Sequence, residues 1–124
     1  MLALWETSRS AASVTPDSAE AVEALIAQPG SVLLLAVEGD ELVGTLVVGW
    51  DGWRGNMYRL AVRADHRRRG IALSLVEAGH DHLRGIGARR VTALVGVEES
   101  EAAALWQAAG YERDRKIGRF VRNF

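Results

Sequence analysis

Hydrophobic positions along the chain alternate between helical and strand-like spacing. Val22, Leu25 and Ile26 fall on one helical face, and Pro29-Gly30 ends that segment. The next apolar runs, "SVLLLAV" and "ELVGTLVVGW", are rich in β-forming residues and lie on either side of the polar "EGDE". This pattern predicts a helix followed by a β-hairpin.

The second half of the chain shows the same change of period. In "MYRLAVRA" the apolar residues alternate like those of a strand, with Leu60 and Val62 on one face. After Gly70 the apolar residues return at helical spacing, and Gly85 is placed to end that helix. A further strand, a short helix and a last strand are predicted in "ARRVTALVGV", "ESEAAALWQAAG" and "KIGRFVRN".

The predicted order is helix, hairpin, strand, helix, strand, helix, strand, which is typical of an α/β layered domain. A length of 124 residues fits one domain, so residues 1–124 are expected to share a single core. The pattern over residues 57–97 predicts a strand–helix–strand unit. Its two strands are expected to be parallel neighbours joined by a right-handed crossover.

Charge and composition restrict the possible partners. The formal net charge is -1 and the pI about 6.3, so no basic face for nucleic acid or for an anionic membrane is expected. The sequence shows no cysteine, no signal peptide and no apolar run of membrane-spanning length, so a cytoplasmic location is expected. His80 and His82 are two positions apart on a predicted helix, so they point to different faces and are placed at the surface, with no metal site.

The loop between the strand and the long helix, "RADHRRRGIA" at residues 63–72, is strongly basic. The first backbone N–H groups of a helix have no partners within it and carry the positive end of its dipole, so they stabilise an anion. Gly70 and Ala72 would let a phosphate approach the backbone, and the three arginines before Gly70 could donate charge-assisted hydrogen bonds. The alternative is a solvated basic surface, and the residues alone leave both interpretations open.

The segment "LAVRADHRRRGIALSLV" resembles the acetyl-CoA-binding signature of the GNAT acetyltransferase superfamily. The signature [Q/R]-x-x-G-x-[G/A] is matched by Arg67, Arg68, Arg69, Gly70, Ile71 and Ala72. Downstream, "ALWQAAGY" resembles the second motif of the family, and "GWDGWRGNMYRLAV" resembles a bacterial subgroup with D-G-x-R-G before the fourth strand. The resemblance implies the GNAT fold, a central mixed sheet with a βαβ acetyl-CoA-binding unit flanked by helices, and acetyl-CoA as co-substrate.

The resemblance also implies how the coenzyme binds. The pyrophosphate would lie on the backbone N–H groups of residues 68–72. The pantetheine would pair like an extra strand with the backbone of Leu60, Ala61 and Val62.

Three further side chains near this site have two interpretations each. Arg63 and His66 either reach the phosphate on the adenosine or are exposed and unattached. Glu99 stands where the family usually has an asparagine, so it either contacts the coenzyme or stabilises the start of a helix.

The implied reaction is transfer of an acetyl group to a primary amine, with a strand N–H near Leu60 as the family's usual donor to the thioester oxygen. It needs loss of a proton from the amine, stabilisation of the oxyanion and departure of the thiolate. Asn56 and Leu94 stand where many relatives have a glutamate, so the base is water, Asp51 or Tyr58. Asp51 could instead form a turn, and Tyr58 could be part of the core or a pocket wall.

Trp106 stands at the position of the tyrosine that often protonates the thiolate in this family. Because an indole N–H is not a useful acid near neutrality, Trp106 is expected to form a wall beside the sulfur end of the coenzyme. Tyr111 fits the aromatic position after Gly110 and is expected to be structural.

The predicted function is therefore acetylation of an amine on a small molecule or peptide, with acceptor contacts from "ETSRSAAS" and "DGWRGN". A non-catalytic acyl-CoA-binding or interaction protein is the alternative, because Asn56, Leu94 and Trp106 depart from the family's catalytic residues. Nucleic-acid binding through the arginine loop ranks below both, and it predicts an affinity that falls steeply with salt.

Members of the family begin with a strand, but "MLALWE" looks like the first helix, so the first strand is expected to be missing. The sheet edge beside it would be open, and open edges favour pairing or covering. A homodimer is therefore expected, or else a natural chain that starts upstream of Met1. Light scattering that gives a clean monomer at high concentration would count against the dimer.

Overall fold

The computed structural model describes residues 19–67, 70–94 and 100–124. Its elements in chain order are α2 (Ala19–Ile26), β1 (Val32–Glu38), β2 (Glu41–Trp50), β3 (Gly55–Val62), the 3₁₀ turn η1 (Ala64–His66), α3 (Ile71–Gly85), β4 (Val91–Ala93) and α4 (Ser100–Ala108). The helix predicted in "MLALWE" and the question of a missing first strand lie outside these residues.

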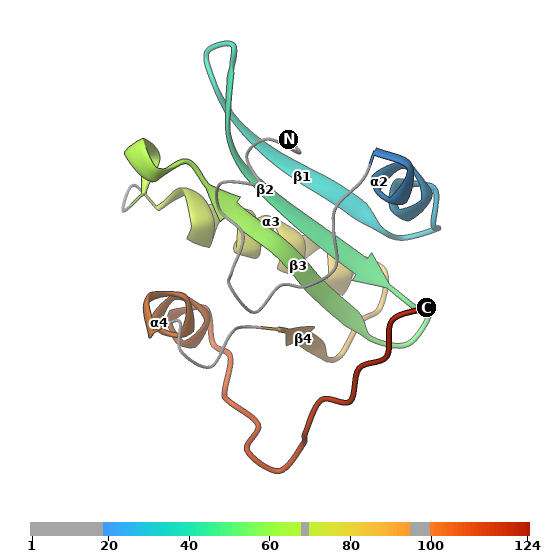
Figure 1. The fold of residues 1–124 in the computed structure, drawn as a ribbon. Helices are drawn as coiled ribbons and strands as arrows, with labels where there is room; N and C mark the ends of the chain where they lie inside the picture. Colours follow the sequence, from blue (N-terminus) through green and yellow to red (C-terminus); the bar gives the residue numbers. More distant parts are fainter. Residues whose placement is uncertain (1–18, 68–69, 95–99) are drawn as a thin grey trace.

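The strands form one sheet in the order β1-β2-β3-β4 (Figure 1). β1 pairs with β2 in antiparallel register, which confirms the hairpin around "EGDE", and β2 pairs with β3 in the same sense. β3 and β4 are parallel neighbours in the sheet, and α3 lies between them in the chain, as the strand–helix–strand prediction requires. The α/β class with a mixed sheet is therefore confirmed.

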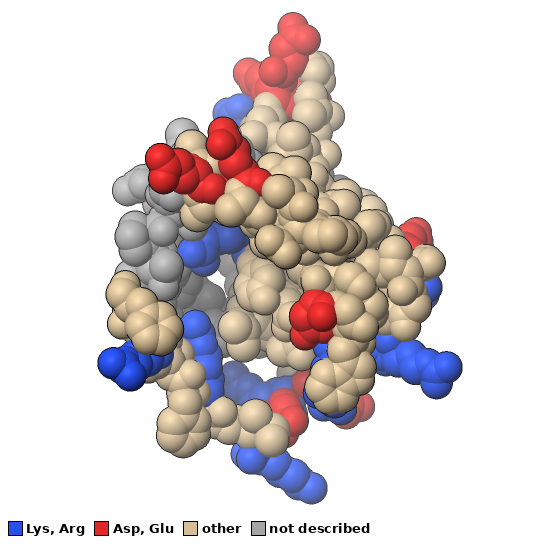
Figure 2. Space-filling model, turned by 90° about the vertical axis from the view of Figure 1, so that its right-hand side faces the viewer, with Lys and Arg blue, Asp and Glu red and all other residues tan. Residues whose placement is uncertain are grey.

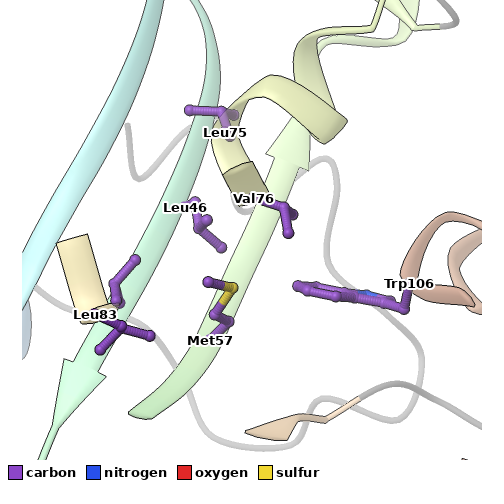
Figure 3. Packing of buried hydrophobic residues seen from close by; sticks show 7 residues of the cluster. Leu46, Met57, Leu75, Val76, Leu83 and Trp106 are labelled. Atoms are coloured by element: carbon purple, nitrogen blue, oxygen red, sulfur yellow. The ribbon is translucent and has the colours of Figure 1, made fainter. Parts of the chain in front are cut away.

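Helices lie on both faces of the sheet (Figure 1). α3 packs on one face against β1, β2 and β3, and α2 lies on the other face at β1. The main core, on the α3 face, contains Leu46, Val48, Met57, Leu75, Val76, Leu83 and Trp106 (Figure 3). A smaller cluster on the α2 face joins Val22, Val47 and Ala61. No helix in the described part of the chain combines the length and the apolar character needed to cross a membrane.

Gly79 allows α3 to lie close to the sheet. A Cβ atom placed on Gly79 would lie 2.7 Å from Met57 Cε and 3.1 Å from Val48 Cγ2, so any larger residue must displace core side chains. Gly85 belongs to the same helix, and a Cβ atom there would meet nothing within 4 Å. The two glycines therefore form a matched pair for measuring the close approach.

Gly79→Ala is expected to lower the free energy of unfolding by up to about 2 kcal/mol, because overpacking costs about 1–3 kcal/mol and the gain in helix propensity is only about 1 kcal/mol. Gly85→Ala gains helix propensity, and its added Cβ overlaps no core side chain. It is therefore expected to raise the free energy of unfolding by about 0.5–1 kcal/mol. Urea denaturation of both variants measures the difference. Equal stabilisation of both would contradict the close approach of α3.

Two predicted strands differ from the structure. β4 contains only Val91–Ala93 of the run "ARRVTALVGV", whose last residues lie outside the described part. The last strand predicted in "KIGRFVRN" is wrong, because residues 112–124 form no strand and are exposed throughout. Alternating hydrophobicity gives a strand only where a neighbour satisfies the backbone groups, and no described strand pairs with this segment.

The sequence predicted surface positions for the two helical histidines, and this prediction is wrong because both are partly buried. His80 Nε2 lies 2.8 Å from the Tyr111 hydroxyl, and His82 Nε2 lies 2.6 Å from the Gly30 carbonyl oxygen. Helical spacing predicts the directions of the two side chains but not what packs against them. Within residues 19–67, 70–94 and 100–124, no group of three or more His, Asp or Glu side chains could hold a metal ion.

Candidate functional site

Within the described part of the chain, the pairing of β3 with β4 ends well before β3 does. The parallel register joins Gly55 to Val91 and ends where Met57 pairs with Ala93. β3 continues to Val62, so residues 58–62 run beyond this register. Among the described residues, the edge of β3 that faces β4 is therefore open over this stretch.

A β-bulge interrupts β3 where this edge opens. On β2, Thr45 pairs with Ala61 and Val47 pairs with Tyr58, and the register shifts between the two pairs. One residue of β2 therefore opposes two residues of β3, at positions 59 and 60. Such a bulge bends the strand and changes the direction of the backbone groups that follow it.

Arg59 is the strained residue of the bulge. Its φ is +52°, the only positive φ at a non-glycine position in the part of the chain that the structure describes. The Thr45 hydroxyl donates a hydrogen bond to the Arg59 carbonyl oxygen at 3.1 Å. Sequence reasoning missed both residues, because the alternation in "MYRLAV" carries no sign of an extra residue.

Backbone contacts after the bulge show which groups face the open edge. The Arg63 N–H donates to the Val43 carbonyl oxygen at 2.8 Å, so Arg63 faces β2. Backbone directions alternate along a strand, so Ala61 also faces β2, whereas Leu60 and Val62 turn their backbone groups toward the open edge.

The N-terminus of α3 follows this edge after a short loop. Arg67, in the loop, donates its Nε–H to the Val62 carbonyl oxygen at 3.3 Å. Gly70 is the N-cap of α3 with a φ of +77°, and no described side chain caps the helix. A Cβ atom on Gly70 would meet nothing within 4 Å, so an anion can approach the N–H groups of Ile71 and Ala72. A hollow of about 320 Å³, lined mainly by apolar side chains of β1 and α3, adjoins Gly70.

Acidic residues partly neutralise the basic loop. Arg63 makes ion pairs of 2.9 Å with both Glu41 and Asp65, and His66 lies 3.0 Å from Glu38 and 2.7 Å from Asp65. The hydrogen bond to His66 is the main reason that the pKa of Asp65 is lowered. Acidic side chains mark the tip of the β1–β2 hairpin, the projection at the top of Figure 2. Arg63 and His66 are thus partly buried and paired with carboxylates, and a phosphate would have to replace these carboxylate partners.

Trp106 belongs to the core. Its side chain is only 8% exposed and projects from α4 toward Val76 and Met57 (Figure 3). Its ring meets Tyr111 edge-on, with centroids 5.0 Å apart and the planes at 75°. Because Met57 is the last residue of β3 that pairs with β4, the indole lies at the level where the open edge begins.

Asp51 shapes the turn between β2 and β3, at the opposite end of β3 from the open edge. Its Oδ1 accepts the N–H of Arg54 at 2.7 Å and that of Trp53 at 2.8 Å, and these hydrogen bonds hold the pKa of Asp51 below its usual value. Tyr58 is 39% exposed, and burial, followed by the charge of Asp51, raises its pKa. The Asp51 carboxylate is therefore a turn former and a weak base, and the Tyr58 phenol stays protonated near neutral pH.

Tyr111 makes a polar contact behind Trp106. Its hydroxyl lies 2.8 Å from His80 Nε2 and 3.4 Å from Met57 Sδ. Burial, followed by the charge of Glu77, raises the pKa of Tyr111 to about 12. The structural role expected from the sequence fits these contacts.

The raised pKa of Tyr111 predicts a loss of stability in alkali. The folded-state pKa of about 12 lies above the ordinary value of 10.0, so the contribution of the neutral phenol is complete below pH 10.0 and is lost as the pH rises through about 12. The free energy of unfolding of the wild type is expected to fall more steeply over this range than that of Tyr111→Phe. Urea denaturation at stepped pH gives both curves, and parallel curves would contradict the expectation.

The structure brings most of the predicted coenzyme-contact residues to one end of β3 and the adjoining start of α3. The described members of this group are Leu60, Ala61, Val62, Arg67, Gly70, Ile71 and Ala72. Arg68, Arg69 and Glu99 lie outside the described residues. Leu94, at one of the family's glutamate positions, is exposed.

The "DGWRGN" turn lines a second hollow at the other end of β3. The hollow has a volume of about 470 Å³, and its lining includes Trp50, Arg54, Arg89 and Arg90. The Arg54 guanidinium lies 4.0 Å above the ring of the exposed Trp53. This hollow is cationic and aromatic, whereas the one beside Gly70 is mainly apolar.

Comparison with known proteins connects this geometry to a family. Residues 2–111 match the Acetyltransferase (GNAT) family. A curated relative, "Acetyltransferase SG1711" of Sodalis glossinidius (strain morsitans), is 29% identical over 86 residues, which make up 69% of this chain and 61% of that protein. The chain thus spans less than two thirds of the length of this relative.

Solved structures give the same fold. An aminoglycoside acetyltransferase, meta-AAC0020 from an uncultured soil metagenomic sample, superimposes with a TM-score of 0.79 at 17% identity, over 99% of this chain and 85% of that chain. AAC(6')-Iy, in complex with the bisubstrate analog CoA-S-monomethyl-acetylneamine, gives a TM-score of 0.77 at 17% identity, over 99% and 92% of the two chains. At this identity the likeness is one of fold.

Proposed function

Because the chain belongs to the acetyltransferase (GNAT) family, we propose that it transfers an acetyl group from acetyl-CoA to a primary amine of a small molecule or peptide. The observation that carries the proposal is that, among the described residues, the β4 side of β3 is open after Met57 and no side chain caps the adjoining N-terminus of α3. An extended chain with amide groups can add to an open strand edge, and a pyrophosphate suits a helix N-terminus. Coenzyme A carries both groups on one molecule.

The proposal places each part of the coenzyme. The pyrophosphate lies on the N–H groups at Gly70, Ile71 and Ala72, where the αL conformation of Gly70 leaves open space. The pantetheine lies along β3 at Leu60, since Arg67 already occupies the Val62 carbonyl oxygen. Trp106 then forms the wall near the thioester.

The chemistry follows from this placement. The amine nitrogen attacks the thioester carbonyl carbon, a C–N bond forms, the C–S bond breaks, and the amine proton passes to a base. A backbone N–H near Leu60 donates to the carbonyl oxygen as negative charge develops on it. A coenzyme A thiolate is a moderately weak base, so it can leave without full proton transfer from an acid at the position of Trp106.

Water is the base in this proposal. The Asp51 carboxylate holds a turn and has a lowered pKa, and the raised pKa of Tyr58 keeps its phenol protonated. Asp51→Asn retains the Oδ1 acceptor of the turn and removes the carboxylate charge. Because water is the base, the kcat of this variant is expected to stay within about twofold of the wild type. Loss of a general base would instead cost about 10²–10⁴-fold. A fall of kcat by about 100-fold in the folded variant would instead identify Asp51 as the base.

A non-catalytic acyl-CoA-binding protein is the second candidate. It is favoured by the buried indole at the position of the family's acid and by the weak basicity of the Asp51 carboxylate, both among the described residues. This candidate binds coenzyme A as the first does but turns nothing over. The two therefore differ in turnover and not in binding.

The test is acetyl-CoA-dependent release of thiol with a panel of primary amines, including diamines, amino acids and peptide N-termini. The chain contains no cysteine, so the protein contributes no thiol to the signal. Amine-dependent release that rises with enzyme concentration, with an acetylated product of the expected mass, is the predicted result. Coenzyme A binding without turnover on any amine would favour the non-catalytic protein.

A further inference from the structure

The bulge in β3 contains a backbone conformation that needs an explanation. At a φ of +52°, the Cβ of Arg59 crowds the following carbonyl group, which is why this region is usually left to glycine. Strained residues persist only where their surroundings hold them in place. Some contact in the structure must therefore hold Arg59.

Thr45 makes that contact. Its side chain is fully buried within β2, and its hydroxyl donates to the Arg59 carbonyl oxygen at 3.1 Å. The neighbouring residues Val43 and Val47 are also buried and are apolar. A valine would fill the same volume as Thr45, so the hydroxyl is the feature that distinguishes this position.

The held carbonyl lies at the junction of two parts of β3. Before it, β3 is paired with β4 as far as Met57, and after it Leu60 turns its backbone groups toward the open edge. A slip of the bulge by one residue would reverse which backbone groups face that edge. The geometry of the edge at Leu60 therefore depends on the bulge at Arg59.

We propose that Thr45 is a positioning residue for acetyl transfer, which holds the Arg59 carbonyl so that the backbone at Leu60 meets the thioester in productive geometry. The inference rests on the proposed function, because it assigns the open edge of β3 to the thioester. Thr45 acts through the backbone and does not touch the substrate. A small displacement of such a donor reduces the rate of the chemical step more than it reduces binding.

The test compares three single variants. Thr45→Val removes the hydroxyl at constant volume, and Thr45→Ser keeps it. Leu83→Val, on α3, weakens the core next to Gly55, at the other end of β3 from the bulge. Thr45→Val is expected to lower kcat by about tenfold or more with a smaller change in the KM for acetyl-CoA, whereas Thr45→Ser stays within about threefold of the wild type. Leu83→Val should lose stability while keeping kcat, and this separates positioning from loss of stability.

A double variant tests the mechanism itself. Because glycine adopts a positive φ without strain, Arg59→Gly added to Thr45→Val is expected to recover part of the lost kcat. An unchanged kcat in folded Thr45→Val would overturn the proposal. Equal losses of kcat in Thr45→Val and Thr45→Ser would do the same.

A binding measurement decides the proposal even if the wild type acetylates no amine. Acetyl-CoA is expected to shift the backbone ¹⁵N–¹H resonance of Leu60 in the wild type and in Thr45→Ser, and to shift it much less in Thr45→Val. The same shift in all three proteins would show that Thr45 does not position this edge, whatever the outcome of the turnover assay.

Discussion

Gly70→Asp is expected to weaken coenzyme A binding by well over tenfold, or about 1.4 kcal/mol or more, while leaving the fold intact. The substitution places a carboxylate on the N-terminus of α3, where the pyrophosphate is proposed to bind. Gly70 has a φ of +77°, and Asp and Asn tolerate this conformation better than other side chains do. A Cβ atom there has open space around it, so the protein should fold.

Gly70→Asn is the matched control, since it has the same shape and the same backbone preference but no charge. Its affinity is expected to lie between those of the wild type and Gly70→Asp. Titration calorimetry at two salt concentrations measures the affinity of all three proteins for coenzyme A. Because salt screens the added charge, the difference in affinity between Gly70→Asp and Gly70→Asn should be smaller at the higher salt concentration. Equal affinities for Gly70→Asp and the wild type would place the pyrophosphate elsewhere.

The second large effect is expected at Trp106. Trp106→Ala should lower the free energy of unfolding by about 3–5 kcal/mol, because a buried indole leaves a cavity among its core neighbours. The same cavity loosens the wall beside the thioester, so activity should be lost with it. Trp106→Phe keeps most of the wall and should retain most of the activity, and Trp106→Tyr, which restores a phenol, is expected to match or exceed the wild-type rate.

Urea denaturation and steady-state rates against pH, measured for the wild type and the three variants, test this expectation. The stability data show whether each variant is folded at the assay temperature. If Trp106→Phe is folded and loses as much activity as Trp106→Ala, then the indole N–H has a chemical role and the wall interpretation is wrong.

The parts of the fold that could be predicted are those set by local periodicity. The turn in "EGDE" separates two apolar runs of strand length, and the helix after Gly70 has its apolar positions at regular spacing. The start of α3 could also be predicted, because its signals lie close together in the sequence. Gly70, which adopts the αL conformation, directly follows the arginines of the basic loop. Local chemistry therefore predicted the region of the candidate site.

The remainder depends on contacts between distant residues. The bulge at Arg59 is stabilised by Thr45, which is 14 positions away in the chain, and no pattern within "MYRLAV" reports it. His80 meets Tyr111 across 31 positions, so helical spacing alone placed it wrongly at the surface. The segment "KIGRFVRN" has the alternation of a strand but lacks a neighbour among the described strands. In each case tertiary packing decides the outcome, and local sequence does not report it.

The most direct test of the account is a crystal structure of the protein with bound coenzyme A. The account predicts the pyrophosphate on the N–H groups from Gly70 to Ala72, the pantetheine along the open edge of β3 at Leu60, and the thiol next to Trp106. Coenzyme A bound instead in the hollow lined by Trp50, Arg54, Arg89 and Arg90, with the edge at Leu60 empty, would contradict it.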